Sequence, residues 1–211
     1  KQDEMKKFNL CEDNINNVLK DIDNNDIVVI LSAYTNPSWI FKNKDEAFQL
    51  NVKYTKKLID DLIPSKCKIC FMSSVEVFDG SKSRITENSK PQPLNYYGKT
   101  KYEVEKYLKD HSSNYQIIRT GWNVGIDKKS RCVVSMTYET LMESNAQMAE
   151  DNTFTITHVD DLVNVLSNYI FKDHKIIHIC SPEIITRIKL ADTIINNSVN
   201  GKKMNYKKTI F

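Results

Sequence analysis

Glycine is scarce in this chain: only five of its 211 residues are glycine, at positions 80, 98, 121, 125 and 201. None of them belongs to a G-x-x-G-x-x-G loop, so these residues contain no Gly-rich turn of the kind that cradles a dinucleotide phosphate. Long apolar runs are also missing. No segment approaches the ~18 apolar residues that a bilayer-spanning helix needs, and no signal-peptide stretch follows Lys1. We therefore expect no membrane segment.

Charge of one sign is nowhere concentrated. The 30 basic and 27 acidic residues are interleaved and give a net charge of +3. Because the chain has no basic block, we expect no nucleic-acid partner. With 40% hydrophobic and 27% charged residues, the composition is that of an ordinary globular protein that is long enough for one core or a domain with a small lobe.

The five cysteines do not form a disulfide framework, because their number is odd and their spacing irregular. Cys67 and Cys70 form a C-x-x-C pair, a spacing found in redox pairs and in halves of zinc sites. No second pair or spaced His pair completes a metal site, and Cys70 lies within an apolar run. We expect buried free thiols, no metal, and by default a reducing, cytoplasmic location.

Strand-like and helix-like segments alternate along the chain. Such a βαβα order predicts an α/β protein with a doubly wound parallel sheet. Ligands of these sheets lie beyond the carboxyl ends of the strands, here at residues 32–36, 73–80 and 120–125. Apolar runs predict strands at 27–31, 68–72, 115–119 and 175–180, and helical spacing predicts helices at 13–20, 46–62, 97–110, 137–147, 160–171 and 188–196.

The end of the second strand carries polar side chains that suit proton transfer. Ser73 and Ser74 follow the strand directly, and after a Pro-bearing loop Tyr97 and Lys101 stand one turn apart on a helix. An ammonium near a phenol lowers the pKa of the phenol, so a tyrosine can act as general acid or base while a serine holds the same oxygen. The hydride would come from a nicotinamide. Taken alone, Y-x-x-x-K is a weak signal, and Tyr97 then remains an ordinary helix-start tyrosine.

In this context the sequence resembles the extended short-chain dehydrogenase/reductase superfamily, and within it the dTDP-4-dehydrorhamnose reductase-like branch of the NAD-dependent epimerases and dehydratases. The resemblance implies a Rossmann-like sheet and extends from about Asn9 to about Ile194. It rests on Leu31-Ser32-Ala33-Tyr34-Thr35, Leu50-Asn51-Val52, Ser73-Ser74-Val75-Glu76-Val77-Phe78-Asp79-Gly80, Pro93-Leu94-Asn95-Tyr96-Tyr97-Gly98-Lys99-Thr100-Lys101 and Arg119-Thr120-Gly121-Trp122.

The resemblance also implies site residues. Ser74, Tyr97 and Lys101 would be catalytic. NAD or NADP would be held by Ser32, Ala33, Tyr34, Asn51 and Ser73 together with Tyr97 and Lys101, and a nucleotide-sugar substrate by Ser74, Glu76, Trp122, Asn123 and Arg131. Structural alternatives stay open for several of them. Asn51 can be a helix-kinking or backbone-bonding residue, Ala33 and Tyr34 can be simple packing residues, Trp122 can be a core aromatic, and Asn123 and Arg131 can be satisfied surface or structural residues.

The chain departs from the family in two places. The Gly-rich first βαβ unit is absent, and Asp151-Asn152-Thr153-Phe154-Thr155-Ile156-Thr157 replaces the family's D-Q-x-G-x-P-T. We expect a Rossmann-type domain at 1–125 and a substrate-binding lobe at 126–211 that is interleaved with the last sheet strands.

The expected function is an NAD(P)-dependent reductase, epimerase or dehydratase of a nucleotide-linked sugar. Resembling proteins are usually homodimers, so the resemblance implies a homodimer here. The alternative is a non-catalytic regulatory or interaction protein that keeps the fold.

Overall fold

The computed structural model describes residues 5–82, 84–125 and 132–210. It divides into two compact units. The first is Lys1–Arg119 with Lys172–His178, and the second is Thr120–Phe171 with Ile179–Phe211. These units are defined by contacts and not by ligands, so the functional division after residue 125 stays a prediction.

A four-stranded sheet forms the centre of the first unit. Its order is β1 (Ile27–Ile30), β2 (Lys68–Ser74), β3 (Tyr115–Thr120) and β7 (Ile176–Ile179). β1 and β2 are parallel, with Ile27 opposite Lys68 and Ile30 opposite Phe71. The α/β class predicted from the alternating pattern is confirmed, as is the Rossmann-like sheet that the resemblance implies, and the apolar runs mark all four strands. Runs without polar alternation suit strands that are covered on both faces.

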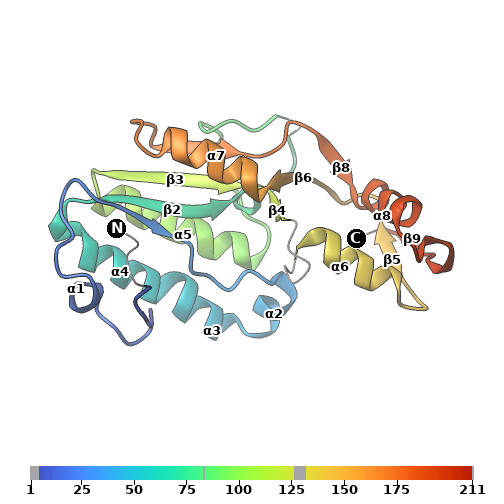
Figure 1. Cartoon of the computed structure of the whole chain (residues 1–211), viewed down its shortest axis with the longest axis horizontal. Helices are drawn as coiled ribbons and strands as arrows, with labels where there is room; N and C mark the ends of the chain where they lie inside the picture. Colours follow the sequence, from blue (N-terminus) through green and yellow to red (C-terminus); the bar gives the residue numbers. More distant parts are fainter. Residues whose placement is uncertain (1–4, 83, 126–131, 211) are drawn as a thin grey trace. The chain divides into compact units, whose positions relative to one another are not determined.

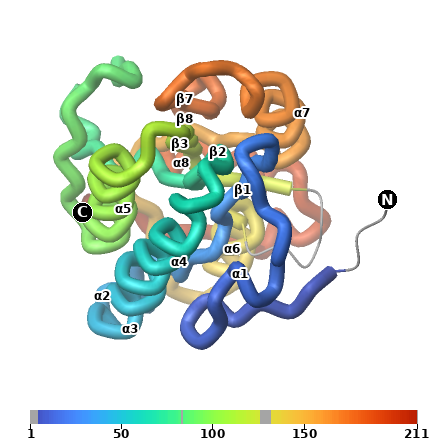
Figure 2. Tube along the Cα trace, turned by 90° about the vertical axis from the view of Figure 1, so that its left-hand side faces the viewer, coloured from blue at the N-terminus to red at the C-terminus, as the bar shows by residue number. Residues whose placement is uncertain are grey.

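Helices of the first unit lie along one side of this sheet (Figures 1 and 2). α3 (Lys44–Phe48), a π-helical turn η1 (Gln49–Tyr54) and α4 (Thr55–Leu62) follow one another without a break. They occupy the span where the sequence predicts a helix at 46–62. α5 (Tyr96–His111) is the other long helix, and the short α2 (Pro37–Lys42) begins after the N-cap Asn36. A 3-10 turn, η2 (Ile63–Ser65), ends α4.

One apolar cluster joins these helices to the strands. Leu58, Ile59 and Leu62 of α4 and Val104 and Leu108 of α5 meet the strand residues Ile69, Phe71 and Ile117. Ile69 and Phe71 are two apart on β2, so they point to the same face of the sheet. The packing therefore fixes which residues at the end of β2 face α5.

The C-x-x-C pair is confirmed as two buried free thiols. Burial raises the pKa of Cys67, and it raises the pKa of Cys70 to about 11. Thiols in this state are poor nucleophiles and poor metal ligands. Across the described ranges, no group of three His, Cys, Asp or Glu side chains could hold a metal ion.

The second unit has two small sheets. β4 (Trp122–Val124), β6 (Thr153–His158) and β8 (Ile184–Thr186) form one, and β5 (Gln147–Ala149) pairs with β9 (Lys207–Thr209) in the other. Its helices are α6 (Val133–Leu141), α7 (Val159–Tyr169), α8 (Arg187–Asn197) and the 3-10 turn η4 (Gly201–Lys203). Val133, Leu141, Phe154 and Leu190 are among its core residues.

The predicted helix at 137–147 is wrong in its second half. α6 ends at Leu141, and Gln147 already begins β5. Ser144 and Asn145 lie between them, and such side chains compete for backbone hydrogen bonds and favour turns over helix. None of the described helices is both long and apolar enough to cross a bilayer.

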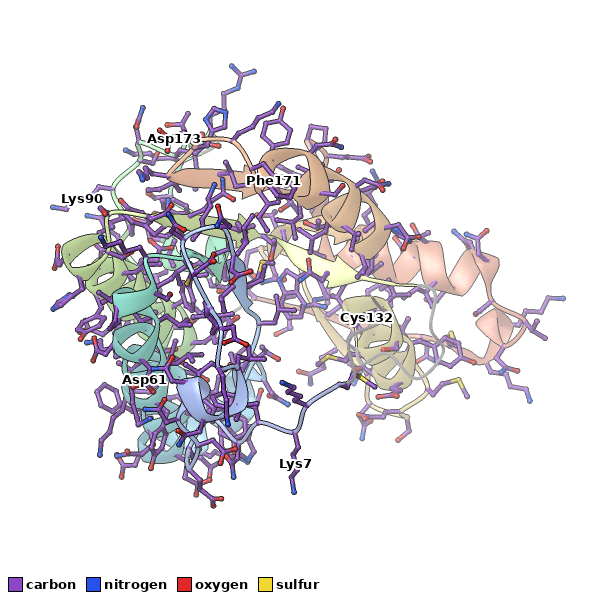
Figure 3. The ribbon with its side chains drawn as sticks, turned by 60° about the vertical axis from the view of Figure 1, so that its left-hand side comes forward. Lys7, Asp61, Lys90, Cys132, Phe171 and Asp173 are labelled. Atoms are coloured by element: carbon purple, nitrogen blue, oxygen red, sulfur yellow. The ribbon has the colours of Figure 1, made fainter. Side chains whose placement is uncertain are left out.

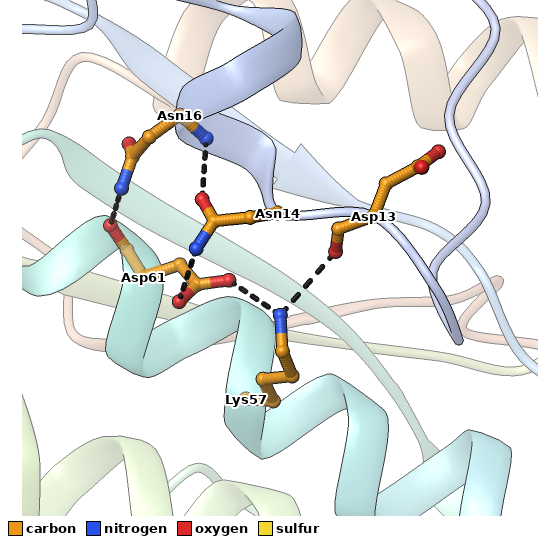
Figure 4. Close-up of polar contacts among 5 residues, drawn as sticks. All are labelled: Asp13, Asn14, Asn16, Lys57 and Asp61. Atoms are coloured by element: carbon orange, nitrogen blue, oxygen red, sulfur yellow. Dashed lines mark hydrogen bonds and ion pairs between the residues drawn. The ribbon is translucent and has the colours of Figure 1, made fainter.

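The segment before β1 is fastened to α4 by polar contacts (Figure 4). Asn14 caps the short α1 (Ile15–Val18) by accepting from the Asn16 N–H at 2.9 Å, and its Nδ2 donates to Asp61 Oδ1 at 3.2 Å. Lys57 Nζ donates to Asp61 Oδ2 at 2.9 Å and to the Asp13 carbonyl at 3.3 Å. This cluster places Ile15 and Leu10 in the apolar cluster of the sheet.

Asn14 tests this attachment. We expect Asn14→Ala to lower the free energy of unfolding by about 1–2 kcal/mol, because a helix cap and a bond to Asp61 are lost together. Urea unfolding measures the change. The control is Asn17→Ala at the exposed Asn17 of the same helix, which should change stability by less than about 0.5 kcal/mol. Equal effects of the two variants would contradict the assigned role.

Candidate active site

One face of α5 meets the carboxyl end of β2. Tyr97, Lys101 and Glu105 are spaced four apart, so they line one face of the helix. The Lys101 ammonium donates to the Met72 carbonyl at 2.9 Å. Glu105 Oε1 accepts from the Ser73 hydroxyl at 2.6 Å.

The third contact of this face joins the catalytic candidates. The Ser74 hydroxyl lies near enough to the Tyr97 phenol to lower the pKa of that phenol. Lys101 Nζ lies 5.8 Å from the centre of the Tyr97 ring. The structure thus brings Ser74 together with Tyr97 and Lys101, which follow it in the sequence by 23 and 27 positions.

The start of α5 is held tightly against the turn that follows β2, the 3-10 turn η3 (Val75–Val77). The N-cap Asn95 accepts from the Gly98 N–H at 2.7 Å and donates to Glu76 Oε2 at 2.5 Å. A Cβ on Gly98 would stand 2.0 Å from the Glu76 carbonyl oxygen. Only glycine permits this approach, and the approach sets the position of the neighbouring Tyr97.

Lys101 is a buried cation, with 3% of its surface exposed. Burial lowers its pKa from 10.5 to about 8, and the Glu105 carboxylate acts in the opposite direction. The ammonium also lies over the Phe71 ring at 4.8 Å. Near neutral pH Lys101 is therefore protonated, with only a small margin.

Tyr97 departs from the sequence-based expectation. Its pKa is raised above the ordinary value of 10, chiefly by burial and then by the charge of Glu76, while the Ser74 hydroxyl lowers it. Lys101 does not offset this because its ammonium is directed to the Met72 carbonyl. The phenol keeps its proton at neutral pH, which is the state a proton donor requires.

The predicted cofactor residues lie near the ends of β1 and β2. Asn51 is 3% exposed; it accepts from the Tyr34 N–H at 2.8 Å and donates to the Tyr34 carbonyl at 2.9 Å. Both bonds join the Asn51 side chain to the Tyr34 backbone, so the backbone-bonding alternative is observed. Asn51 also lies within the π-helical turn. Ser32 is exposed, Ala33 is half-buried, and the Tyr34 ring lies 4.4 Å from that of Trp39. Their contacts with a cofactor remain predictions.

The predicted substrate residues fall in both units. Glu76 lies in η3 and accepts a hydrogen bond from Asn95, the N-cap residue of α5. In the second unit, Trp122 lies 6.0 Å from Phe154, ring to ring, and packs against the core, as the core-aromatic alternative predicts. Asn123 is exposed on β4. Arg131 lies outside the described residues.

The sequence reasoning missed two charged residues beside the site. Glu105 is fully buried and Arg119 is 1% exposed. Arg119 Nε donates to Glu105 Oε1 at 2.8 Å, and Nη2 donates to Oε2 at 2.6 Å. A glutamate on the face of Tyr97 and Lys101, and an arginine inside an apolar strand, were the available signals, because buried charges require partners.

The fold and this strand end define the class as a Rossmann-like α/β protein with a Ser-Tyr-Lys constellation. The family model described as RmlD substrate binding domain matches residues 6–207. The chain belongs to this family.

Curated relatives carry two kinds of description. The rat methionine adenosyltransferase 2 subunit beta is 30% identical over 142 residues, which are 66% of this chain and 42% of the relative. A dTDP-4-dehydrorhamnose reductase from Aggregatibacter actinomycetemcomitans is 32% identical over 100 residues, 47% of this chain and 34% of the relative. The chain thus matches less than half the length of either relative.

Solved structures share the fold. A dTDP-4-dehydrorhamnose reductase from Clostridium acetobutylicum has a TM-score of 0.76 at 24% identity, covering 88% of this chain and 65% of that one. The protein MoeE5, in complex with UDP-glucose and NAD, has a TM-score of 0.79 at 19% identity, covering 97% of this chain and 71% of that one.

Gly98→Ala tests the close approach at the start of α5. The added Cβ would meet backbone atoms of Glu76, so the helix must shift, and we expect a loss of about 1–3 kcal/mol in unfolding free energy. Gly125→Ala is the matched control, since its Cβ would meet Val159 Cγ2 at an ordinary 3.7 Å. Thermal and urea unfolding compare the two. Equal tolerance would show that the approach is not required.

The pKa of Lys101 predicts a pH dependence of stability. Its folded pKa, about 8, is below the ordinary 10.5, so between these values the unfolded state binds more protons and stability rises with pH. We expect the unfolding free energy of the native protein to rise relative to that of Lys101→Met as the pH increases from about 8 to about 10. Urea unfolding across this range measures the difference. Parallel pH profiles would contradict the assignment.

Proposed function

We propose that this chain contains the reaction centre of an NAD(P)-dependent reductase of a nucleotide-linked sugar. The observation that carries the proposal is the convergence of Ser74, Tyr97 and Lys101 at the carboxyl end of β2. Ligands of parallel sheets bind at this end of the strands. Similar solved structures hold NADP or NAD, and some of them hold UDP-glucose or UDP-glucuronic acid.

The residues present fit the nicotinamide end of such a cofactor. A buried ammonium and a protonated phenol lie side by side at a strand end, and both can donate to ribose or sugar oxygens. Lys101 and Tyr97 would hold the nicotinamide ribose, and the loop of Ser32, Ala33 and Tyr34 would flank it. When bound, the nicotinamide would supply the hydride. These residues include no Gly-rich loop for the pyrophosphate.

The proton would come from Tyr97. Its phenol is un-ionised, so it can donate to a sugar carbonyl oxygen as the hydride arrives at the carbon. Ser74, whose hydroxyl lies near the same phenol, would hold that oxygen. The phenolate left behind would be stabilised by the Lys101 ammonium, which is present below pH about 8.

Two observations favour reduction over dehydration. A dehydratase would need an acidic side chain free to act beside the catalytic serine, whereas the Glu76 carboxylate accepts a hydrogen bond from Asn95. The protonated state of Tyr97 is also that of a donor and not of a base. We propose the reductive direction on these grounds.

The second candidate is a non-catalytic subunit. It is favoured by the curated relatives described as methionine adenosyltransferase 2 subunit beta. Size-exclusion chromatography with and without a methionine adenosyltransferase catalytic subunit would test it, and the same run would report whether the protein alone is the homodimer that its resemblance implies. A stable mixed complex, with no binding of NADH or NADPH, would favour this candidate.

Tyr97→Phe tests the reductase directly. We expect a fall in kcat of about 10²–10⁴-fold, the usual contribution of a general acid, with NADPH or NADH binding retained. The assay follows nicotinamide oxidation with a 4-keto dTDP- or UDP-sugar. Tyr96→Phe is the control, because the neighbouring Tyr96 is half-buried beneath Lys44, whose Nζ is 5.7 Å from the ring centre. Full activity of Tyr97→Phe, or no nucleotide binding by the native protein, would overturn the proposal.

A further inference from the structure

A second set of buried polar residues stands directly behind the catalytic candidates. Glu105 and Arg119 form a two-bond ion pair with 0% and 1% of their surfaces exposed. The Ser73 hydroxyl donates to the same carboxylate at 2.6 Å. Nothing in the proposed proton transfer uses this pair, yet it touches the residue next to Ser74 and stands one helical turn from Lys101.

The pair joins three elements at the reaction centre. Glu105 lies on α5, Ser73 on β2 and Arg119 on β3. Arg119 Nη1 also lies 3.3 Å from His178 Nε2 on β7, and its guanidinium lies 5.0 Å from the centre of the Phe78 ring. Glu105 therefore links α5 to β2 through Ser73 and to β3 through Arg119, and Arg119 extends the link to β7.

Folding alone gives a weak reason for such a pair. Removing two charges from water is costly, and an apolar pair of similar volume is often as stable. An effect on neighbouring groups is the stronger reason, because charges act over longer distances in a buried, poorly screened site. The neighbouring group that responds is the other buried cation, Lys101.

We propose that Glu105, held by Arg119, is a positioning residue of the reaction centre: it fixes the end of β2 through Ser73 and provides the negative charge that Lys101 faces. It touches neither substrate nor cofactor. The inference rests on the proposed roles of Tyr97 and Lys101, but its test measures the charge of Lys101 itself and requires no cofactor.

The charges around Lys101 determine in which direction the loss of Glu105 would shift the pKa of Lys101. Glu105 acts on Lys101 from the same helix and favours the ammonium. The other charged or titratable groups around this network are Tyr97 on α5, Glu76 on η3, Arg119 on β3, His178 on β7 and Glu87, whose carboxylate accepts from the His178 N–H at 3.1 Å. Burial lowers the pKa of His178, so this histidine adds little positive charge at neutral pH. Removing the carboxylate would leave two buried cations, Lys101 and Arg119, without their negative partner.

The test is a pH titration of Lys101 by NMR in protein labelled with ¹³C at the lysine side chains. The Lys101 resonance is assigned by its loss in Lys101→Arg. We expect a midpoint near 8 in the native protein and a downward shift of about one pH unit or more in Glu105→Gln. Ser73→Ala is the matched control: it removes a hydrogen bond to Glu105 but no charge, so the midpoint should stay within a few tenths of a unit.

Arg119→Met gives an independent result of opposite sign, should Glu105→Gln fail to fold. It leaves the carboxylate without its arginine, so the midpoint of Lys101 should rise. A folded Glu105→Gln with an unchanged midpoint, or an Arg119→Met with an unchanged or lower one, would overturn the proposal. Failure of the reductase assay with these shifts intact would overturn the proposed function and leave the role of Glu105 standing.

Discussion

The contact between one face of α5 and the last three residues of β2 is the constraint on which the rest of the site depends. Each of the three strand residues has its own neighbour on the helix. The Met72 carbonyl accepts from Lys101, the Ser73 hydroxyl donates to Glu105, and the Ser74 hydroxyl lies near Tyr97. The apolar cluster beneath sets the register, because Ile69 and Phe71 pack on α4 and α5. Figure 3 shows the side chains of the first unit, in which Asp61 marks α4 and Lys90 marks the loop before α5.

Burial gives this contact its chemical character. In water a tyrosine and a lysine would have nearly equal pKa values. Here the same desolvation moves them apart in opposite directions, raising that of Tyr97 and lowering that of Lys101. The phenol thereby remains protonated and can donate, and the pKa of the ammonium, about 8, lies close to neutral pH. Such a pair is suited to a single proton transfer, and its charge balance depends on the Glu105 carboxylate behind it.

Much of this arrangement could be predicted from the sequence, for physical reasons that also explain what could not. Apolar runs identify all four strands of the main sheet, although polar residues interrupt two of them. Tyr97 and Lys101 share a helical face because of their spacing. The strand β6 was missed although Thr153–His158 alternates polar and apolar residues, a pattern that favours a half-buried strand. The positions of Glu105 and Arg119 in the sequence indicate that each is buried, but they do not show that the two side chains pair, because each lies on a different element. The raised pKa of Tyr97 could not be predicted, because it depends on how deeply the phenol is buried and the spacing of residues does not show this.

The relatives include both reductases and a subunit of another enzyme, so the strand end decides between the two proposals. A crystal structure of the protein with NADPH would show whether this strand end holds the nicotinamide. We expect the nicotinamide ribose at hydrogen-bond distance from Lys101 Nζ and Tyr97 Oη, with the Lys101 ammonium turned from the Met72 carbonyl. A nucleotide bound elsewhere, with the contact between Lys101 and Met72 unchanged, would contradict this expectation.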